Sequence, residues 1–233
     1  MWRSLKAVSF DLDNTLWDVE PVLERAEQAL RRWLAVNCPR LAARYDDAAL
    51  QELRRELAAR HPGRAHDLTW LRTEALRQCA VRTAYPETIA ALAFAVFHEA
   101  RNQIDPYPDV RPALALLARR FPLYALSNGN ADVRRVGLGD LFADAIGAEA
   151  AGAAKPDPRI FQVLLARAAL APTTVLHVGD DPHTDIVGAR RVGMLTAWVN
   201  RRGEQWPASV PRPDLEVRDL AELVRLLESP ARP

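Results

Sequence analysis

The chain lacks an excess of charge of either sign, and it lacks long apolar runs. Its 31 basic and 30 acidic residues leave a formal net charge of +1, which argues against nucleic acid or a lipid surface as a partner. The apolar run near the start is too short for a signal peptide, and the longest later run, residues 89–97, is too short to span a bilayer. We therefore expect a cytoplasmic protein with no membrane partner.

Cysteine is scarce as well. Cys38 and Cys79 are the two cysteines, and their positions match neither metal-ligand spacing nor a redox motif. We expect both to be reduced structural thiols.

Lysine is scarce in the same way, because 29 of the 31 basic residues are arginine and the other two are Lys6 and Lys155. A lysine that persists in such a chain is a candidate for a tight site that needs a compact point charge. Lys155 precedes Pro156, which favours an extended backbone, and Asp157 with Pro158 is typical of a helix start. Its side chain should therefore leave a loop beside the start of a helix.

The chain has two regions with different sequence patterns. Residues 19–103 have a helical pattern rich in Ala, Leu, Glu and Arg, with no convincing strand. The helices predicted there cover residues 21–36, 46–60, 68–82 and 86–102. From residue 107 onward, short β-like runs alternate with helical ones, which is the pattern of parallel strands with crossover helices.

Together with the first apolar run, this pattern predicts five strands, at residues 7–10, 122–127, 144–148, 175–179 and 195–199. The helices predicted between and after them cover residues 110–120, 132–136, 158–169, 184–192 and 220–227. The Pro-rich residues 207–213 should form a surface connection to the last helix. The sequence thus predicts an α/β core (residues 1–17 and 104–233) interrupted by a helical insert (residues 18–103), a candidate lid.

The first strand ends in two carboxylates. Asp11 and Asp13 project to the same side because side chains on a strand alternate faces, whereas Leu12 points away. Two like charges so close are unfavourable unless a cation, a shared proton or a substrate lies between them. A strand that runs into an Asx-rich turn is the alternative interpretation of Asp11, Asp13 and Asn14.

Other polar clusters also follow predicted strands. In open parallel sheets the ligand crevice lies outside the carboxyl ends of the strands, so these clusters should converge. Turn formation and helix capping remain alternatives for each cluster, with Asp181 before Pro182 as an N-cap and Asp185 as a first-turn acid. An acid cluster of this kind needs a divalent cation, and carboxylate oxygens near a phosphate suit Mg²⁺. The converging side chains are Asp11, Asp13, Thr15, Ser127, Asn128, Lys155, Asp180, Asp181 and Asp185.

These residues resemble the four motifs of the haloacid dehalogenase superfamily, in order along the whole chain. The motifs are Asp11-Leu12-Asp13-Asn14-Thr15, Ser127-Asn128, Lys155-Pro156 and Gly179-Asp180-Asp181-Pro182-His183-Thr184-Asp185. The resemblance implies a Rossmann-like open parallel sheet with an all-helical cap inserted between the first and second motifs.

The resemblance also implies a role for each residue. Asp11 is the nucleophile that forms an aspartyl-phosphate, and Asp13 is the acid/base. Thr15 and Ser127 hydrogen-bond the phosphoryl oxygens with help from the Asn128 backbone, and Lys155 neutralises charge. The implied Mg²⁺ ligands are Asp11, Asp180 and the carbonyl of Asp13, whereas Asp181 or Asp185 holds waters or Lys155.

Asp13 separates the branches of the superfamily. Its dehalogenases work without metal and lack a carboxylate at this position, and its transport ATPases have no second aspartate there. The resemblance therefore favours a Mg²⁺-dependent phosphatase acting on a small-molecule phosphate ester. A phosphomutase is the alternative, followed by a 2-haloacid dehalogenase and a non-catalytic phosphate-binding protein. We expect a monomer or homodimer.

The helical insert and nearby segments also indicate a class of substrate. Residues 66–72, 129–131, 137–140 and 177–181 resemble a bacterial subgroup of these phosphatases that includes an enzyme for flavin mononucleotide and the phosphorylated ribitylaminouracil intermediate of riboflavin synthesis. Trp70 could stack on the heterocycle of such substrates, and Arg72 could meet a polar edge or the phosphate. Alternatively, Trp70 belongs to the core of the helices and Arg72 is a surface arginine.

Overall fold

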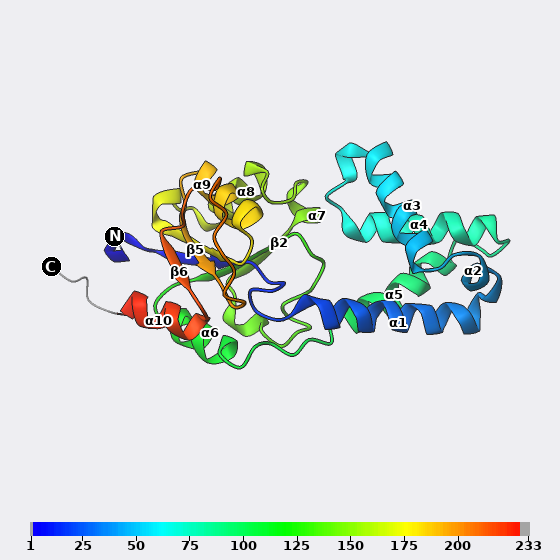
Figure 1. Cartoon of the computed structure of the whole chain (residues 1–233), viewed down its shortest axis with the longest axis horizontal. Helices are drawn as coiled ribbons and strands as arrows, with labels where there is room; N and C mark the ends of the chain where they lie inside the picture. Colours follow the sequence, from blue (N-terminus) through cyan, green and yellow to red (C-terminus); the bar gives the residue numbers. More distant parts are fainter. Residues whose placement is uncertain (1, 229–233) are drawn as a thin grey trace. The chain divides into compact units, whose positions relative to one another are not determined.

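The computed structural model describes residues 2–228, and the chain divides into two compact units (Figure 1). The sheet unit comprises the residues up to Asp18, Asp105–Gly129 and the residues from Val133 onward. The helical unit comprises Val19–Ile104 together with Asn130–Asp132.

The sheet unit contains a six-stranded sheet in the order β3-β2-β1-β4-β5-β6, and every neighbouring pair is parallel. The strands are β1 (Ala7–Phe10), β2 (Leu123–Ser127), β3 (Asp144–Gly147), β4 (Val175–Gly179), β5 (Leu195–Val199) and β6 (Leu215–Val217). The predicted Rossmann-like α/β fold is confirmed. All residues of β1, β2 and β4 are buried, which explains their continuous apolar runs.

Helices cover both faces of this sheet, as Figure 1 shows for α6 and α10 on one side and α8 and α9 on the other. Ile160, Phe161 and Leu164 of α8 pack with β2 residues such as Leu126 in the core on their side. The helices of the sheet unit are α6 (Val110–Ala118), α7 (Ala148–Ala151), α8 (Pro158–Ala168), α9 (Gly188–Arg191) and α10 (Leu220–Glu228). A π-helical turn, Pro182–Val187, precedes α9.

The prediction of five strands was wrong, because β6 is a sixth. It has three residues at the edge of the sheet, and only Val217 among them is buried. So short a segment carries no alternation of apolar and polar residues from which to recognise it. Residues 207–213 consequently lead into β6 rather than directly to α10.

The predicted helix at residues 132–136 was also wrong. The chain forms a turn there, in which the Val133 carbonyl accepts a hydrogen bond from the Leu138 amide at 2.9 Å. Gly137 has a positive φ of 79°, a conformation that glycine adopts without strain. A five-residue segment that ends at such a glycine is too short to offset the cost of helix nucleation.

The helical unit has no strand among its described residues, as predicted. Its helices are α1 (Val19–Asn37), α2 (Pro39–Arg44), α3 (Asp47–Arg60), α4 (Leu68–Arg82) and α5 (Ile89–Arg101). The sequence interpretation missed α2, a six-residue helix that begins at Pro39. Side-chain caps start two of the others, because Asp46 accepts from the Ala49 amide and Asp67 from the Trp70 amide.

Leucine, alanine and cysteine side chains from all five helices form one apolar core. Cys38 and Cys79 are buried in it as free thiols, and burial raises the pKa of each. The prediction of structural thiols agrees with these positions. Among the described residues, no helix combines the length and apolarity needed to cross a membrane.

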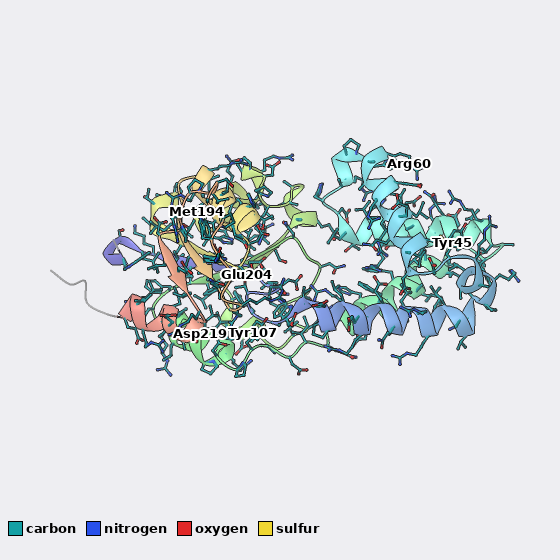
Figure 2. All side chains as sticks on the ribbon, in the orientation of Figure 1. Tyr45, Arg60, Tyr107, Met194, Glu204 and Asp219 are labelled. Atoms are coloured by element: carbon teal, nitrogen blue, oxygen red, sulfur yellow. The ribbon has the colours of Figure 1, made fainter. Side chains whose placement is uncertain are left out.

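The chain leaves the sheet unit and returns to it at neighbouring points. The amide of Tyr107, labelled in Figure 2, donates a hydrogen bond of 2.9 Å to the Leu16 carbonyl. Arg201 holds both segments: its Nε donates to the Thr15 carbonyl at 3.1 Å, and its guanidinium lies 4.0 Å from the centre of the Tyr107 ring. The same guanidinium forms two 3.0 Å hydrogen bonds with Asp109.

Candidate active site

The polar clusters follow the carboxyl ends of the strands, as expected. Asp11 directly follows β1, Ser127 ends β2, and Asp180 follows Gly179 at the end of β4. Lys155 lies in the loop between α7 and α8. Because the strands are parallel, their carboxyl ends lie at the same edge of the sheet, where ligands bind in open α/β folds.

Lys155 joins two of the predicted carboxylates. Its Nζ donates to Asp185 Oδ1 at 2.7 Å and also pairs with Asp11 Oδ1. The side chains of Lys155, Asp11 and Asp185 are 2%, 10% and 1% exposed, so both ion pairs are removed from water. Asp157 caps α8 just beyond the lysine by accepting from the Arg159 amide, which agrees with the predicted helix start.

Thr15 connects two carboxylates at the same edge. Its Oγ1 donates to Asp180 Oδ1 at 3.1 Å and lies 3.4 Å from Asp11 Oδ2. Within residues 2–228, Asp11, Asp180 and Asp185 each offer a carboxylate oxygen, and these oxygens lie within 4.8 Å of one another.

Asp13 lies in a tight turn after β1 and outside this three-carboxylate group. Asn14 has a positive φ of 61°, which asparagine tolerates better than most residues. Its amide donates to the Trp17 carbonyl at 2.7 Å, and the Trp17 indole Nε1 donates to Asp13 Oδ1 at 2.8 Å. The buried Trp17 therefore orients the second carboxylate of the motif, a role that the sequence interpretation did not assign.

Asn128 holds Lys155 in place through its side chain. Its Oδ1 accepts from the Lys155 amide at 2.7 Å, and its Nδ2 donates to the Lys155 carbonyl at 2.9 Å. Ser127 is 4% exposed, and its Oγ accepts from the Gly129 amide at 2.9 Å. The second motif thus orders the loop that carries the lysine.

The two acids that the sequence left undecided have different contacts. Asp181 Oδ1 accepts from the amides of His183 and Thr184 at 2.8 and 2.7 Å, so it caps the π-helical turn. Asp185 contacts Lys155, and its Oδ2 accepts from the Asp181 amide at 3.1 Å. Of the two, Asp185 is the acid in contact with the lysine.

The charges of this cluster are not balanced. Burial, together with the nearby Asp185 carboxylate, raises the pKa of Asp180 to about 6. Burial likewise raises the pKa of Asp11 well above its usual value, although Lys155 opposes this shift. Burial also opposes the charges of Lys155 and Asp185, but the Asp11 and Asp185 carboxylates raise the pKa of the lysine, and Lys155 together with His177 lowers the pKa of Asp185.

A divalent cation fits this charge distribution. Three carboxyl groups share this site with one lysine, and carboxylate oxygens are the ligands that hard cations prefer. Asp185 already accepts from Lys155 and the Asp181 amide, and its Oδ1 lies 3.2 Å from His177 Nε2. Asp11 and Asp180 are therefore the side chains with the capacity to hold a cation.

Trp70 and Arg72, the residues predicted to meet the substrate, make contacts inside the helical unit. The Trp70 ring packs edge-on against His61 at 5.1 Å, and the Arg64 guanidinium lies 4.4 Å from its centre. Arg72 pairs with Glu27 at 2.8 Å and lies 3.5 Å from the centre of the Phe97 ring. Its Nη1 is buried without a hydrogen-bond partner among the described residues.

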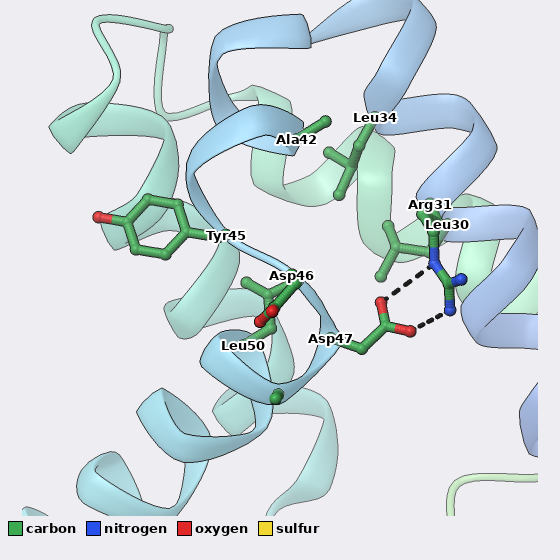
Figure 3. Close-up of a pocket in the computed structure, with 9 residues that line it drawn as sticks. Leu30, Arg31, Leu34, Ala42, Tyr45, Asp46, Asp47 and Leu50 are labelled. Atoms are coloured by element: carbon green, nitrogen blue, oxygen red, sulfur yellow. Dashed lines mark hydrogen bonds and ion pairs between the residues drawn. The ribbon is translucent and has the colours of Figure 1, made fainter.

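Two cavities accompany these elements. A cavity of about 300 Å³ in the helical unit is lined by Leu30, Leu34 and other side chains of α1–α3, and the Arg31–Asp47 ion pair lies at its rim (Figure 3). It contains none of the motif residues. A smaller cavity of about 50 Å³ in the sheet unit is lined by Asp180, Trp198 and neighbouring residues. The chemistry, rather than the volume, identifies the site.

Besides Trp17, the sequence interpretation missed three supporting residues. Trp198 Nε1 donates to the Asp180 carbonyl at 2.7 Å, Arg201 holds the Thr15 carbonyl, and His177 contacts Asp185. Each lies in or just after a strand. Residues 177–181 contribute to the resemblance to the phosphatase subgroup, but residue spacing alone gives no signal of these contacts.

This fold and these carboxylates define a hydrolase class. Residues 5–193 match the family model for haloacid dehalogenase-like hydrolases, and the chain belongs to this family. The resemblance seen in the four motifs is thereby confirmed.

Individual relatives include phosphatases and a dehalogenase. The chain is 32% identical to 5-amino-6-(5-phospho-D-ribitylamino)uracil phosphatase YigB of Escherichia coli, with 96% of both chains covered. It is also 32% identical to the glyceraldehyde 3-phosphate phosphatase of Methanopyrus kandleri, covering 96% of this chain and 98% of that one. A solved structure of 2-haloacid dehalogenase from Pseudomonas syringae pv. tomato superposes with a TM-score of 0.91 at 40% identity, covering 96% and 98% of the two chains.

We predict that Gly179→Ala disturbs the site. A Cβ at residue 179 would lie 2.3 Å from Asp185 Cγ, so the buried carboxylate would have to move. We expect a loss of about 1–3 kcal/mol in the free energy of unfolding, measured by urea denaturation. Gly147→Ala is the control, because a Cβ at the end of β3 meets nothing within 4 Å. Equal losses in both variants would refute the close packing of Asp185 on Gly179.

A second prediction concerns pH. The folded protein without divalent cations binds the Asp180 proton more tightly than the unfolded chain, because the pKa of Asp180 rises to about 6 on folding. Ionisation of Asp180 therefore lowers the stability of the fold progressively as pH rises from about 4 to about 6, and Asp180→Asn removes that effect. We expect the variant to melt a few degrees above the wild type at pH 7 in EDTA, with the difference shrinking below pH 6 and disappearing towards pH 4. A difference in Tm that is independent of pH would contradict the shift.

Proposed function

We propose that the protein is a Mg²⁺-dependent phosphomonoester hydrolase that acts on a small phosphorylated metabolite. The observation that carries the proposal is the convergence of Asp11, Lys155 and Asp180 at the carboxyl edge of the sheet, with Asp13 two residues after Asp11. Phosphoryl transfer depends chiefly on positioning and on charge stabilisation, and this cluster can supply both.

In the first step, an oxygen of the Asp11 carboxylate attacks phosphorus, and the bond from phosphorus to the ester oxygen breaks. Asp13 gives its proton to the departing alkoxide, which leaves as an alcohol. Lys155 and the Thr15 and Ser127 hydroxyls would bind the phosphoryl oxygens. The product of this step is an aspartyl-phosphate on Asp11.

In the second step, the Asp13 carboxylate accepts a proton from water as the water oxygen attacks phosphorus. The bond between phosphorus and the Asp11 oxygen breaks, and inorganic phosphate leaves. Trp17 supports this role because its indole holds Asp13 Oδ1 at 2.8 Å. Asp13 ends the cycle protonated, ready for the next ester.

Asp11, Asp180 and the main-chain carbonyl of Asp13 would hold Mg²⁺. When bound, the ion supplies charge neutralisation between an anionic substrate and an anionic nucleophile. Thr15 and Trp198 support this assignment, because they contact the carboxylate and the carbonyl of Asp180.

The dehalogenase of Pseudomonas syringae makes dehalogenation the second candidate. Asp13 weighs against it, since dehalogenases of the superfamily lack a carboxylate there and a reaction at carbon has no alkoxide to protonate. A phosphomutase would keep both aspartates, and its reaction would conserve the phosphate ester instead of releasing phosphate.

For the substrate, we propose flavin mononucleotide or 5-amino-6-(5-phospho-D-ribitylamino)uracil. This proposal is supported by the sequence similarity of the chain to the Escherichia coli phosphatase of the second compound, which extends over 96% of both chains. In this proposal the helical unit is a cap that selects the substrate, and Trp70 and Arg72 take part in the selection.

We predict that the release of phosphate from phosphate esters by this protein depends on Mg²⁺ and on Asp11. Asp11→Asn removes the nucleophile at nearly constant size, so kcat should fall by about 1000-fold or more. The assay is phosphate release from both ribityl phosphates, sugar phosphates and nucleotides, with and without EDTA.

The same samples separate the alternatives. Circular dichroism of Asp11→Asn should match the wild type, which would exclude unfolding as the cause of lost activity. Halide release from 2-chloropropionate would identify a dehalogenase, and an isomerised sugar phosphate without free phosphate would identify a mutase. Full phosphatase activity in Asp11→Asn would overturn the mechanism.

We further predict that Trp70→Ala raises KM for flavin mononucleotide at least about tenfold, which corresponds to about 1.4 kcal/mol of lost stacking, but changes KM for a small ester little. Trp33→Ala is the matched control, because Trp33 is another partly buried tryptophan packed on the same helical core. Similar changes in both variants would assign Trp70 to core packing alone.

A further inference from the structure

His177 lies in β4, beneath the ion pairs of Lys155, and is fully buried. Both ring nitrogens have partners: Nδ1 lies 2.8 Å from Ser9 Oγ, and Nε2 lies 3.2 Å from Asp185 Oδ1. Ser9 is the residue of β1 that pairs with His177 in the sheet, and it too is fully buried. The Phe161 ring packs edge-on against the imidazole at 5.3 Å.

The direction of these hydrogen bonds follows from the partners. Asp185 accepts from Lys155 Nζ and from the Asp181 amide, and a carboxylate with two such donors acts as an acceptor. His177 Nε2 must therefore carry the proton that points at Asp185. Its Nδ1 is then an acceptor, and the Ser9 hydroxyl donates to it.

Asp185 is consequently held from three sides. Oδ1 accepts from Lys155 and from His177, and Oδ2 accepts from the Asp181 amide. Because the Asp185 side chain is 1% exposed, a rotation of this carboxylate would break at least one of these contacts, and bulk water could not reach the site to replace it. Lys155 pairs with both Asp185 and Asp11. The position of the Asp185 carboxylate therefore determines where the Lys155 ammonium contacts the nucleophile.

We propose that His177 and Ser9 are positioning residues for the reaction. Ser9 orients the imidazole, the imidazole fixes the Asp185 carboxylate, and Asp185 places the Lys155 ammonium against Asp11. Neither residue touches substrate. This inference rests on the proposed hydrolase function for its kinetic consequence, whereas the hydrogen-bond chain itself can be tested without turnover.

The kinetic test uses two amides of different length. The side-chain nitrogen of glutamine occupies about the place of imidazole Nε2, whereas that of asparagine occupies about the place of Nδ1. His177→Gln thus keeps a donor towards Asp185, and His177→Asn keeps only a partner for Ser9. Both variants lose the ring that packs against Phe161, so both should lose stability.

We expect His177→Asn to lower kcat on the best phosphate ester by about 10–100-fold, the usual effect of removing a hydrogen bond behind a charged site residue. His177→Gln should recover most of that loss, while KM and Tm stay similar in the two variants. If the two variants are equally impaired while the wild type is active, the positioning role is wrong. An inactive wild type would instead refute the proposed function.

The second readout is the tautomer of His177, which needs neither substrate nor metal. The chain has five histidines, so ¹⁵N-histidine NMR of the whole protein is tractable, and His177→Gln assigns the signal. We expect a single Nε2–H tautomer whose ring proton exchanges slowly with water. Ser9→Ala, which removes one hydroxyl, should perturb this signal and lower kcat by about threefold to tenfold. An Nδ1–H tautomer, or an averaged signal in the wild type, would overturn the inferred chain.

Discussion

Lys155 is buried between Asp11 and Asp185, and the other parts of the site depend on this arrangement. Removing an ammonium from water costs several kcal/mol, so its place is tolerated only because two carboxylates meet it. Asn128 then holds the main chain of the lysine, and Gly179 leaves room for Asp185. Residues that follow β1, β2 and β4 thus converge on this one lysine.

Asp180 shows the opposite balance. It is a further carboxylate in a buried cluster that Lys155 cannot neutralise, and its pKa of about 6 reflects first its burial and then the nearby Asp185 carboxylate. A structure selected for stability alone would have a neutral side chain here. Strain of this kind is common where a charged ligand completes the site, since the ligand relieves it on binding.

The sequence predicted those residues of the candidate site that form recognisable motifs along the chain. Asp11, Thr15 and Asp180 follow strands, Lys155 follows the short helix α7, and all four lie at the same edge of the parallel sheet. His177 and Trp198 escaped prediction because they lie inside strands, where aromatic residues are common and a hydrogen bond leaves no pattern. The prediction of a helix at residues 132–136 was wrong, and β6 was missed, for another reason. Segments of three to five residues carry too little periodic signal to be recognised.

The hydrogen bond between the Tyr107 amide and the Leu16 carbonyl gives the helical segment the geometry of a closed loop. The segments of the sheet unit that lead into and out of the helical segment meet at this hydrogen bond, and Arg201 contacts both of them. The spacing of β1 and β2 in the sheet is then independent of how many residues separate them along the chain. Such an insertion can lengthen, shorten or be exchanged for another in the course of evolution without moving the residues at the carboxyl edge of the sheet.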